Sequence, residues 1–171
     1  MQEVAPLSES QPAPVPAPAA YDYYDVRGGT VVSRLVWAFL FVVPLAVLTT
    51  AAFLHPSAAH HGTHTQLGLP PCGFLVVTGF PCPGCGLTTA FANMVRGNAI
   101  AAAQANPFGI LLFLVTLFSM PVSLLGAVRG WRVVAVLERL HADRWALVLA
   151  AVSITVWVTK IVTLLAQRHA G

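Results

Sequence analysis

The sequence predicts an all-α integral membrane protein with three transmembrane helices and a short re-entrant or interfacial helical hairpin after a C-P-G-C turn. The first observation is composition: 57% of the 171 residues are hydrophobic and 9% are charged, against ~45–50% and ~25% in soluble domains. So few charged side chains cannot cover the surface of a soluble fold. The second observation is that the chain contains three apolar stretches of membrane-spanning length. The third is a helical repeat of apolar residues after the C-P-G-C turn.

The chain begins with a segment rich in proline and alanine. Five of the 13 prolines fall between Pro6 and Pro18, and their alternation with alanine favours an extended, unpacked chain. We therefore predict a disordered cytoplasmic tail over residues 1–30 and a membrane domain over residues 31–171.

Three spans are predicted, at about residues 35–54, 107–128 and 145–165. A helix of ~20 residues, at a rise of ~1.5 Å per residue, crosses the ~30 Å hydrocarbon core of a bilayer. Lys160 lies near the end of the third span. We favour a side chain whose stem extends to the membrane surface; the alternative is an ion or proton site inside the membrane.

The distribution of basic residues predicts the orientation. Six of the nine Lys and Arg residues lie before the first span or between the second and the third, and positive charge marks cytoplasmic segments. We expect a multi-pass protein of the bacterial inner membrane, with a cytoplasmic N-terminus and an outward Cys/His loop at residues 55–106. The link 129–144 alternates apolar residues with arginines, which predicts a short helix on the membrane surface.

The outward loop contains all three cysteines of the chain, in the spacing C-x9-C-x2-C. After the last of them, apolar residues recur at i, i+3, i+4, i+7 and i+8 and predict a helix over 87–95. Arg96-Gly97-Asn98 is typical of a helix stop followed by a new N-cap, which predicts a second helix over 99–105. The residues that we single out as a structural motif of turns, caps and packing are Gly79, Pro83, Gly84, Gly86, Thr88, Gly97, Asn106 and Pro107. Asn106 is the expected N-cap of the second span, with Pro107 at its first position.

Three interpretations of the cysteines stay open. Cys82 and Cys85, three residues apart at the start of a helix, have the spacing of a redox-active disulfide, because helix-terminal amides stabilise a thiolate. Cys72, Cys82 and Cys85 could instead supply three of the four ligands of zinc, with a loop histidine such as His61 as the fourth. Soft thiolates also suit Cu(I). The third interpretation is a structural disulfide or packed thiols.

Over residues 78–90, T-G-F-P-C-P-G-C-G-L-T-T-A, the chain resembles a bacterial membrane family of unknown function, DUF2752, with a T-G-x-x-C-P-x-C-G-x-T-R-A core. The similarity continues through R-G-N at 96–98 and N-P-F-G at 106–109, and covers roughly Cys72 to the end of the second span. The resemblance implies a small multi-span membrane protein and no settled activity. Thr89 stands where the family pattern has arginine, so the resemblance carries no cation role to this position.

Together these observations favour a non-enzymatic accessory or scaffold protein whose C-x-x-C loop is structural, with no catalytic residue and no cofactor. The alternatives are a membrane-anchored thiol–disulfide exchange protein using Cys82 and Cys85, and a zinc- or copper-binding membrane protein. No P-loop, nucleophile elbow or H-E-x-x-H motif occurs in the sequence. The net charge of +3 is too sparse for a nucleic-acid-binding face. The expected partners are the lipid bilayer and another membrane protein or a second copy of this chain.

Overall fold

The computed structural model describes residues 28–170, with side chains described up to Arg168. Over these residues the chain is helical and contains no β-strand. Most of the predicted tail, residues 1–27, lies outside the described residues. The structure therefore confirms the all-α fold class for the membrane domain.

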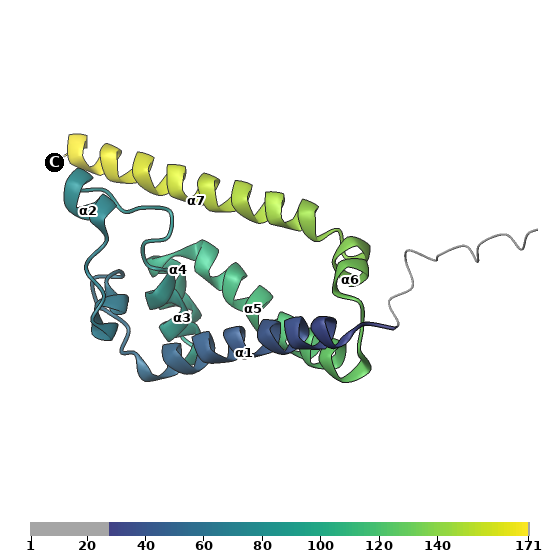
Figure 1. The fold of residues 1–171 in the computed structure, drawn as a ribbon. Helices are drawn as coiled ribbons and strands as arrows, with labels where there is room; N and C mark the ends of the chain where they lie inside the picture. The colour runs from purple at the N-terminus through teal and green to yellow at the C-terminus, as the bar shows by residue number, and fades with distance from the viewer. Residues whose placement is uncertain (1–27, 171) are drawn as a thin grey trace, which may run out of the picture.

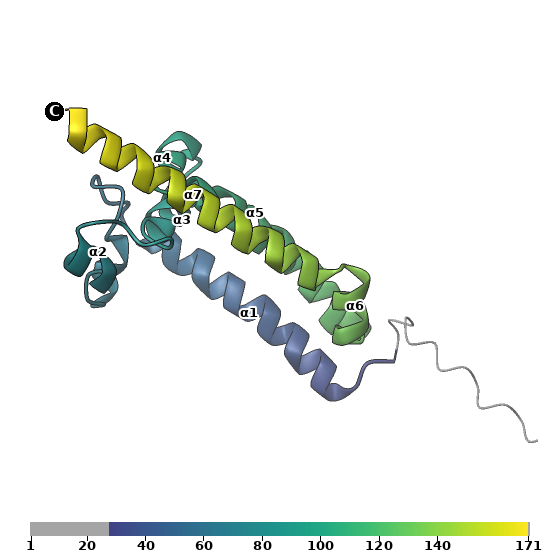
Figure 2. The ribbon, with the colours of Figure 1, turned by 90° about the horizontal axis from the view of Figure 1, so that it is seen from above.

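Three long helices follow the predicted spans: α1 (Val31–Phe53), α5 (Pro107–Arg129) and α7 (Ala142–Ala170). All three are long and apolar enough to cross a membrane. Most of their large apolar side chains are exposed, as expected for surfaces that contact lipid rather than water. Figures 1 and 2 show the three helices running along the length of the molecule. Helix α5 lies beside α1, and α7 lies on the side of α5 away from α1. This is a membrane protein.

The close contact between α1 and α5 depends on a residue without a side chain. A Cβ atom added to Gly126 of α5 would lie 2.5 Å from the ring of Trp37 in α1. The indole nitrogen of Trp37 also donates a hydrogen bond of 2.9 Å to the carbonyl of Trp131. Small residues at such positions let membrane helices approach closely, so Gly126 sets the spacing of this pair.

The predicted hairpin is present as α3 (Leu87–Val95) and α4 (Ala99–Ala105). The bounds agree with the sequence analysis because the caps form as expected. The side chain of Asn98 accepts a hydrogen bond of 3.2 Å from the amide of Ala101, and that of Asn106 accepts one of 3.1 Å from Phe108 at the start of α5. The hairpin packs against both α1 and α5, around the buried Ala90, Ala102 and Ala105.

Arg96 joins this hairpin to the end of the first span. Its guanidinium donates hydrogen bonds to the carbonyls of Ala51 (3.3 Å) and Ala52 (2.9 Å) at the C-terminal end of α1. Carbonyls in the last turn of a helix have no partner within the helix, and a cation there also interacts favourably with the helix dipole. Helix α3 is therefore held against α1 and α5, and helix α4 is held against α5.

Three short helices complete the fold. The link between the second and third spans forms α6 (Val133–Arg139), in agreement with the short helix predicted there; its place on a membrane surface stays a prediction. The outward loop holds a 3-10 helix, η1 (Thr63–Leu67), and a helix, α2 (Gly73–Thr78). The sequence analysis did not predict these two, because six residues or fewer show no helical period.

Candidate three-cysteine site

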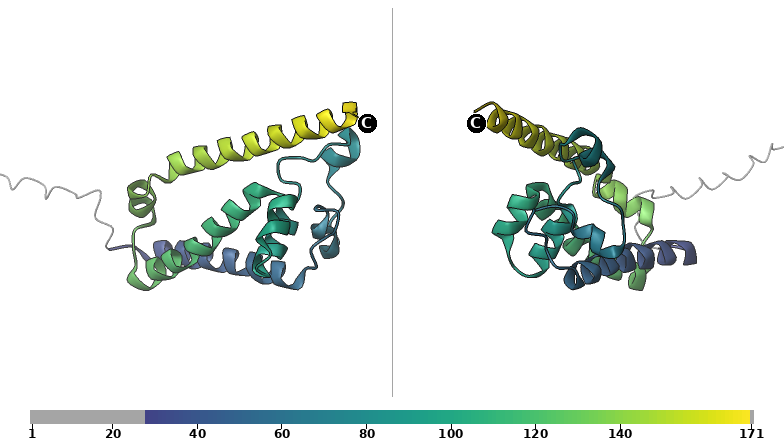
Figure 3. Two further views of the ribbon diagram at one scale, coloured as in Figure 1. Left: turned by 180° about the vertical axis from the view of Figure 1, so that it is seen from behind. Right: turned by 90° about the vertical axis from the view of Figure 1, so that its left-hand side faces the viewer.

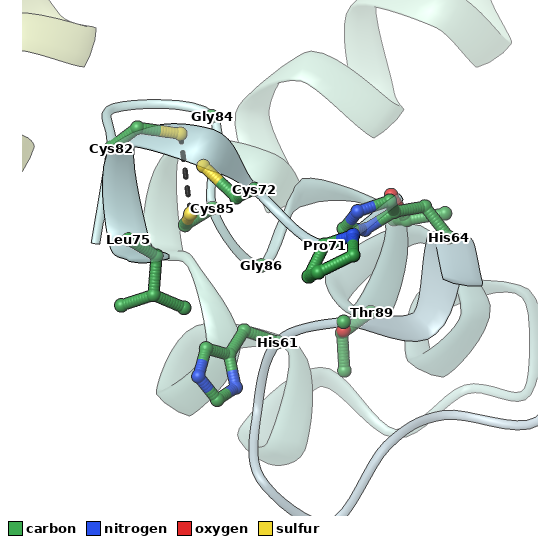
Figure 4. A pocket seen from close by; sticks show the side chains of 12 residues that line it. His61, His64, Pro71, Cys72, Leu75, Cys82, Gly84, Cys85, Gly86 and Thr89 are labelled. Atoms are coloured by element: carbon green, nitrogen blue, oxygen red, sulfur yellow. Dashed lines mark hydrogen bonds between the residues drawn. The ribbon is translucent and has the colours of Figure 1, made fainter. Parts of the chain in front are cut away.

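Two segments of the loop bring the cysteines together. Cys72 is the N-cap residue of α2, and Cys82 and Cys85 lie in the turn that leads into α3. The three sulfur atoms all lie within 4.8 Å of one another, and those of Cys82 and Cys85 are 3.2 Å apart. All three are free thiols in the structure. Figure 4 shows the sulfur atoms pointing toward one another; we call this group the three-cysteine site.

The corner between α4 and α5 holds the C-P-G-C turn in place. The amide nitrogen of the Asn106 side chain donates to the carbonyls of Pro83 (3.2 Å) and Cys85 (3.1 Å). Gly86 has a φ of +89°, and a Cβ atom there would lie 2.5 Å from the carbonyl oxygen of Ala105. Only glycine combines this left-handed backbone with so close an approach. The turn therefore packs against Ala105 and Asn106, directly before the second span.

The third span contacts the same turn from the other side. The indole nitrogen of Trp157 donates to the carbonyl of Pro81 (2.8 Å), and the ammonium of Lys160 donates to the carbonyl of Ala105 (2.8 Å). The guanidinium of Arg168 lies 4.7 Å above the centre of the Phe80 ring. Figures 1 and 3 show α2 beside the C-terminal end of α7.

Lys160 differs from the interpretation that the sequence favoured. We expected its stem to extend to the membrane surface, but its ammonium is half-buried and bonded to a backbone carbonyl. The carbonyl of Ala105 faces the side chain because α4 ends there and α5 starts after it. The alternative, an ion or proton site inside the membrane, stays a prediction.

The sulfur atoms line one side of a cavity of about 460 Å³. Its other lining residues include His61, His64, Leu75, Thr88 and Thr89. The ring of His64 is hydrogen-bonded to the carbonyl of Pro70 (3.1 Å). The Nδ1 atom of His61 is buried and has no hydrogen-bond partner among the described residues.

Of the predicted metal ligands, the structure groups the cysteines and leaves the histidine apart. No histidine within residues 28–168 joins the three sulfur atoms in one cluster. Figure 4 shows the ring of His61 lower in the same pocket, pointing away from the sulfur atoms. The sulfur of Cys72 lies with those of Cys82 and Cys85, so the structure groups all three of the predicted cysteine ligands.

Thr89 lies beneath this cavity. It is completely buried, and its hydroxyl lies 2.7 Å from that of Thr63. The hydroxyl of Thr63 also accepts a hydrogen bond of 3.0 Å from the amide of Ser57. The hydroxyl pair thus ties η1 to α3.

The thiols differ in acidity. The backbone amide of Leu75, in the first turn of α2, lowers the pKa of Cys72 to about 7, with further contributions from the side chains of Cys85 and Cys82. Burial, and after it the nearby Cys82 and Cys72 thiols, raise the pKa of Cys85 to about 12. Near neutral pH the site therefore contains one thiol that ionises readily and one that stays protonated unless a cation displaces its proton.

Comparison with known proteins places this region in context. Residues 72–120 match the family described as protein of unknown function DUF2752. The match confirms the resemblance seen in the sequence. It covers less than a third of the chain, yet it contains all three cysteines, the hairpin and the first part of α5. No curated protein and no solved structure matches the chain. The family description names no activity, so the function has to be argued from the site.

Proposed function

We propose that the protein is a zinc-binding membrane protein and that the three-cysteine site is its metal site. The observation that carries this proposal is the convergence of three sulfur atoms within 4.8 Å of one another. Sulfur ligands ~2.3 Å from a tetrahedral zinc ion lie about 3.8 Å apart, so small side-chain movements would suffice to bind the ion. A redox disulfide would use only two of these thiols and would not explain why the third sulfur atom lies beside them.

His61 is the proposed fourth ligand. His61 lines the same cavity as the sulfur atoms, and its Nδ1 atom is buried without a hydrogen-bond partner among the described residues. A buried nitrogen that lacks a hydrogen bond is costly, and binding a metal ion would satisfy it. Rotation of the ring toward the sulfur atoms would complete a Cys₃His set, which is a common zinc site.

A zinc ion here would have a structural effect. It would join the start of α2 to the turn before α3. Structural zinc sites contribute directly to folding. This role is compatible with the accessory or scaffold protein that the sequence favoured, and that role remains part of the proposal.

A second candidate function is thiol–disulfide exchange, which the lowered pKa of Cys72 favours. A thiolate near neutral pH is the attacking group in such reactions. The two candidates differ in the resting state of the protein. A zinc site requires three reduced thiols and bound metal, whereas an exchange protein would cycle with a Cys82–Cys85 disulfide.

The orientation belongs to the same proposal. We propose a cytoplasmic N-terminus in a bacterial cell, with the site toward the outer face of the inner membrane, and the distribution of basic residues supports this orientation. Labelling of intact cells with a membrane-impermeant thiol reagent, after metal chelation, would test this. Labelling of Cys72 only after cell lysis would contradict the outward placement.

Elemental analysis of the protein purified in detergent tests the zinc proposal. We expect about one zinc ion per chain, lost in Cys72→Ser, Cys82→Ser and Cys85→Ser, and a weaker affinity in His61→Ala, which lacks the proposed fourth ligand. His55→Ala is the matched control, because His55 is exposed and does not line the cavity. A folded, reduced protein without metal would contradict the proposal. If the purified protein instead contains copper, and His61→Ala does not change its binding, the thiols are metal ligands but the metal is not zinc.

A further inference from the structure

We infer that Lys160 supplies the positive charge that balances the three-cysteine site, so that the third span completes the metal site. This inference rests on the proposed zinc binding and extends it to a residue outside the family match, which ends at residue 120. A zinc ion with three thiolates and a neutral histidine carries a net charge of −1. One ammonium group makes the assembly neutral.

The geometry connects Lys160 to the site through one carbonyl group. The ammonium is 2.8 Å from the carbonyl oxygen of Ala105, and the same oxygen lies against Gly86, the residue after Cys85. The neighbouring Asn106 donates to the carbonyl of Cys85.

One turn earlier on the same face of α7, Trp157 donates to the carbonyl of Pro81. This second contact fixes the helix against the turn, so Lys160 is held at the site by more than its own flexible stem. Both contacts come from the apolar part of α7, within the segment able to cross a membrane. The helix thus directs its lysine toward the end of α4.

The distribution of acidic residues bears on which anion balances the charge of Lys160. A cation within a membrane span is costly and usually faces a partner. The only carboxylate side chains within residues 28–168 are Glu138 and Asp143. Asp143 is in the first turn of α7, about 26 Å along the helix from Lys160 at ~1.5 Å per residue. In this part of the chain, the cysteine thiols are the other side chains that carry a negative charge once ionised.

The ammonium also bonds the last carbonyl of α4, and this contact suggests a competing, purely structural role. The two roles make different demands on the side chain. A structural role needs a hydrogen-bond donor of similar length, which glutamine supplies. Charge balance needs a cation, which arginine supplies and glutamine does not.

The test measures zinc affinity of the full-length protein in detergent by competition with a chromophoric chelator. We expect Lys160→Gln and Lys160→Met to weaken zinc binding about tenfold or more, as loss of an outer-shell partner does. Lys160→Arg should stay within about threefold of the wild type. The matched control is Arg168→Gln, which removes a second cation of α7 that contacts the loop at Phe80. Because Arg168 is exposed, its loss should change affinity by less than about threefold.

The outcomes separate the two proposals. Zinc binding in all variants, with the ranking just given and equal melting temperatures of the metal-free proteins, supports the charge-balancing role. Wild-type affinity in Lys160→Gln overturns it and leaves the zinc site standing. A lower melting temperature of metal-free Lys160→Met, with no change in zinc affinity, also overturns it in favour of the structural role. A wild-type protein that binds no zinc overturns both.

Discussion

The helix bundle and the three-cysteine site are held together in different ways. In the bundle, α1, α3, α4 and α5 meet through small residues, with backbone and side chains in direct contact at Gly126 and around Ala90. At the site, α7 and the loop meet through single contacts, such as the hydrogen bond from Trp157 to Pro81. None of the most apolar part of α7 is buried.

The difference separates positions that set the fold from positions that carry chemistry. Larger side chains do not fit at the close contacts of the bundle, so substitutions at these positions lower the free energy of unfolding. Substitutions in α7 and in the loop remove individual interactions and leave the bundle intact. We therefore expect the largest effects where the two regions touch, at the turn that contains Gly86.

Gly86→Ala should have the largest effect. It places a Cβ atom 2.5 Å from the carbonyl of Ala105 at a φ of +89°, and we expect a loss of about 2–5 kcal/mol from left-handed strain and overpacking. Thermal unfolding in detergent measures it. Gly97→Ala is the control, because Gly97 has a φ of +76° with nothing within 4 Å, and about 1–2 kcal/mol of strain remains. Equal losses would show that the contact with Ala105 does not matter.

Asn106→Ala should have the next largest effect. It removes the N-cap of α5 and both hydrogen bonds to the C-P-G-C turn, which together amount to about 3 kcal/mol. Asn98→Ala removes only a cap, that of α4, and should cost about 1 kcal/mol. Both are measured by thermal unfolding. If the two variants unfold alike, Asn106 does not hold the turn.

Trp157→Phe should have a smaller effect, confined to the contact between α7 and the loop. The ring still reaches Phe74, which lies edge-on to it at 6.3 Å, but the hydrogen bond to Pro81 is lost, at a cost of about 1 kcal/mol. Exposed Trp145 provides the control, and Trp145→Phe should stay within about 0.5 kcal/mol of the wild type. Hydrogen exchange of residues 80–86 should increase in the first variant alone.

The last prediction concerns reactivity and leaves the fold unchanged. In the metal-free, reduced protein, alkylation of Cys72 should rise through about pH 7, since its pKa is lowered to that value and the thiolate is the reacting form. Cys85 should stay protonated and unreactive until the pH approaches its pKa of about 12. Peptide mass spectrometry after timed alkylation at several pH values measures both. Identical profiles for the two thiols would contradict the asymmetry.

The bundle could be predicted from the sequence because its signals are local. Asn98 and Asn106 cap helices within three residues of themselves, and apolar length alone indicates the three spans. The proximity of Cys72 to the other thiols was weighed as one of several alternatives, since it depends on α2, a helix too short to show a period.

The role of Lys160 could not be predicted in the same way. Its partner, Ala105, lies 55 residues earlier in the chain, and nothing near Lys160 in the sequence indicates that α7 passes the C-P-G-C turn. Hydropathy favoured a snorkelling side chain because a lysine near the end of a span commonly extends to the interface. Long-range packing, which a single sequence does not reveal, decides its direction.

The contact between Lys160 and Ala105 sets an order of events during synthesis. The cysteines and both helices of the hairpin leave the ribosome well before the third span does. Until that last span enters the bilayer, the turn lacks the hydrogen bond from Trp157 to Pro81, and the carbonyl of Ala105 lacks its ammonium partner. A nascent chain stalled before α7 would therefore carry the three thiols without the contacts that α7 adds beside them.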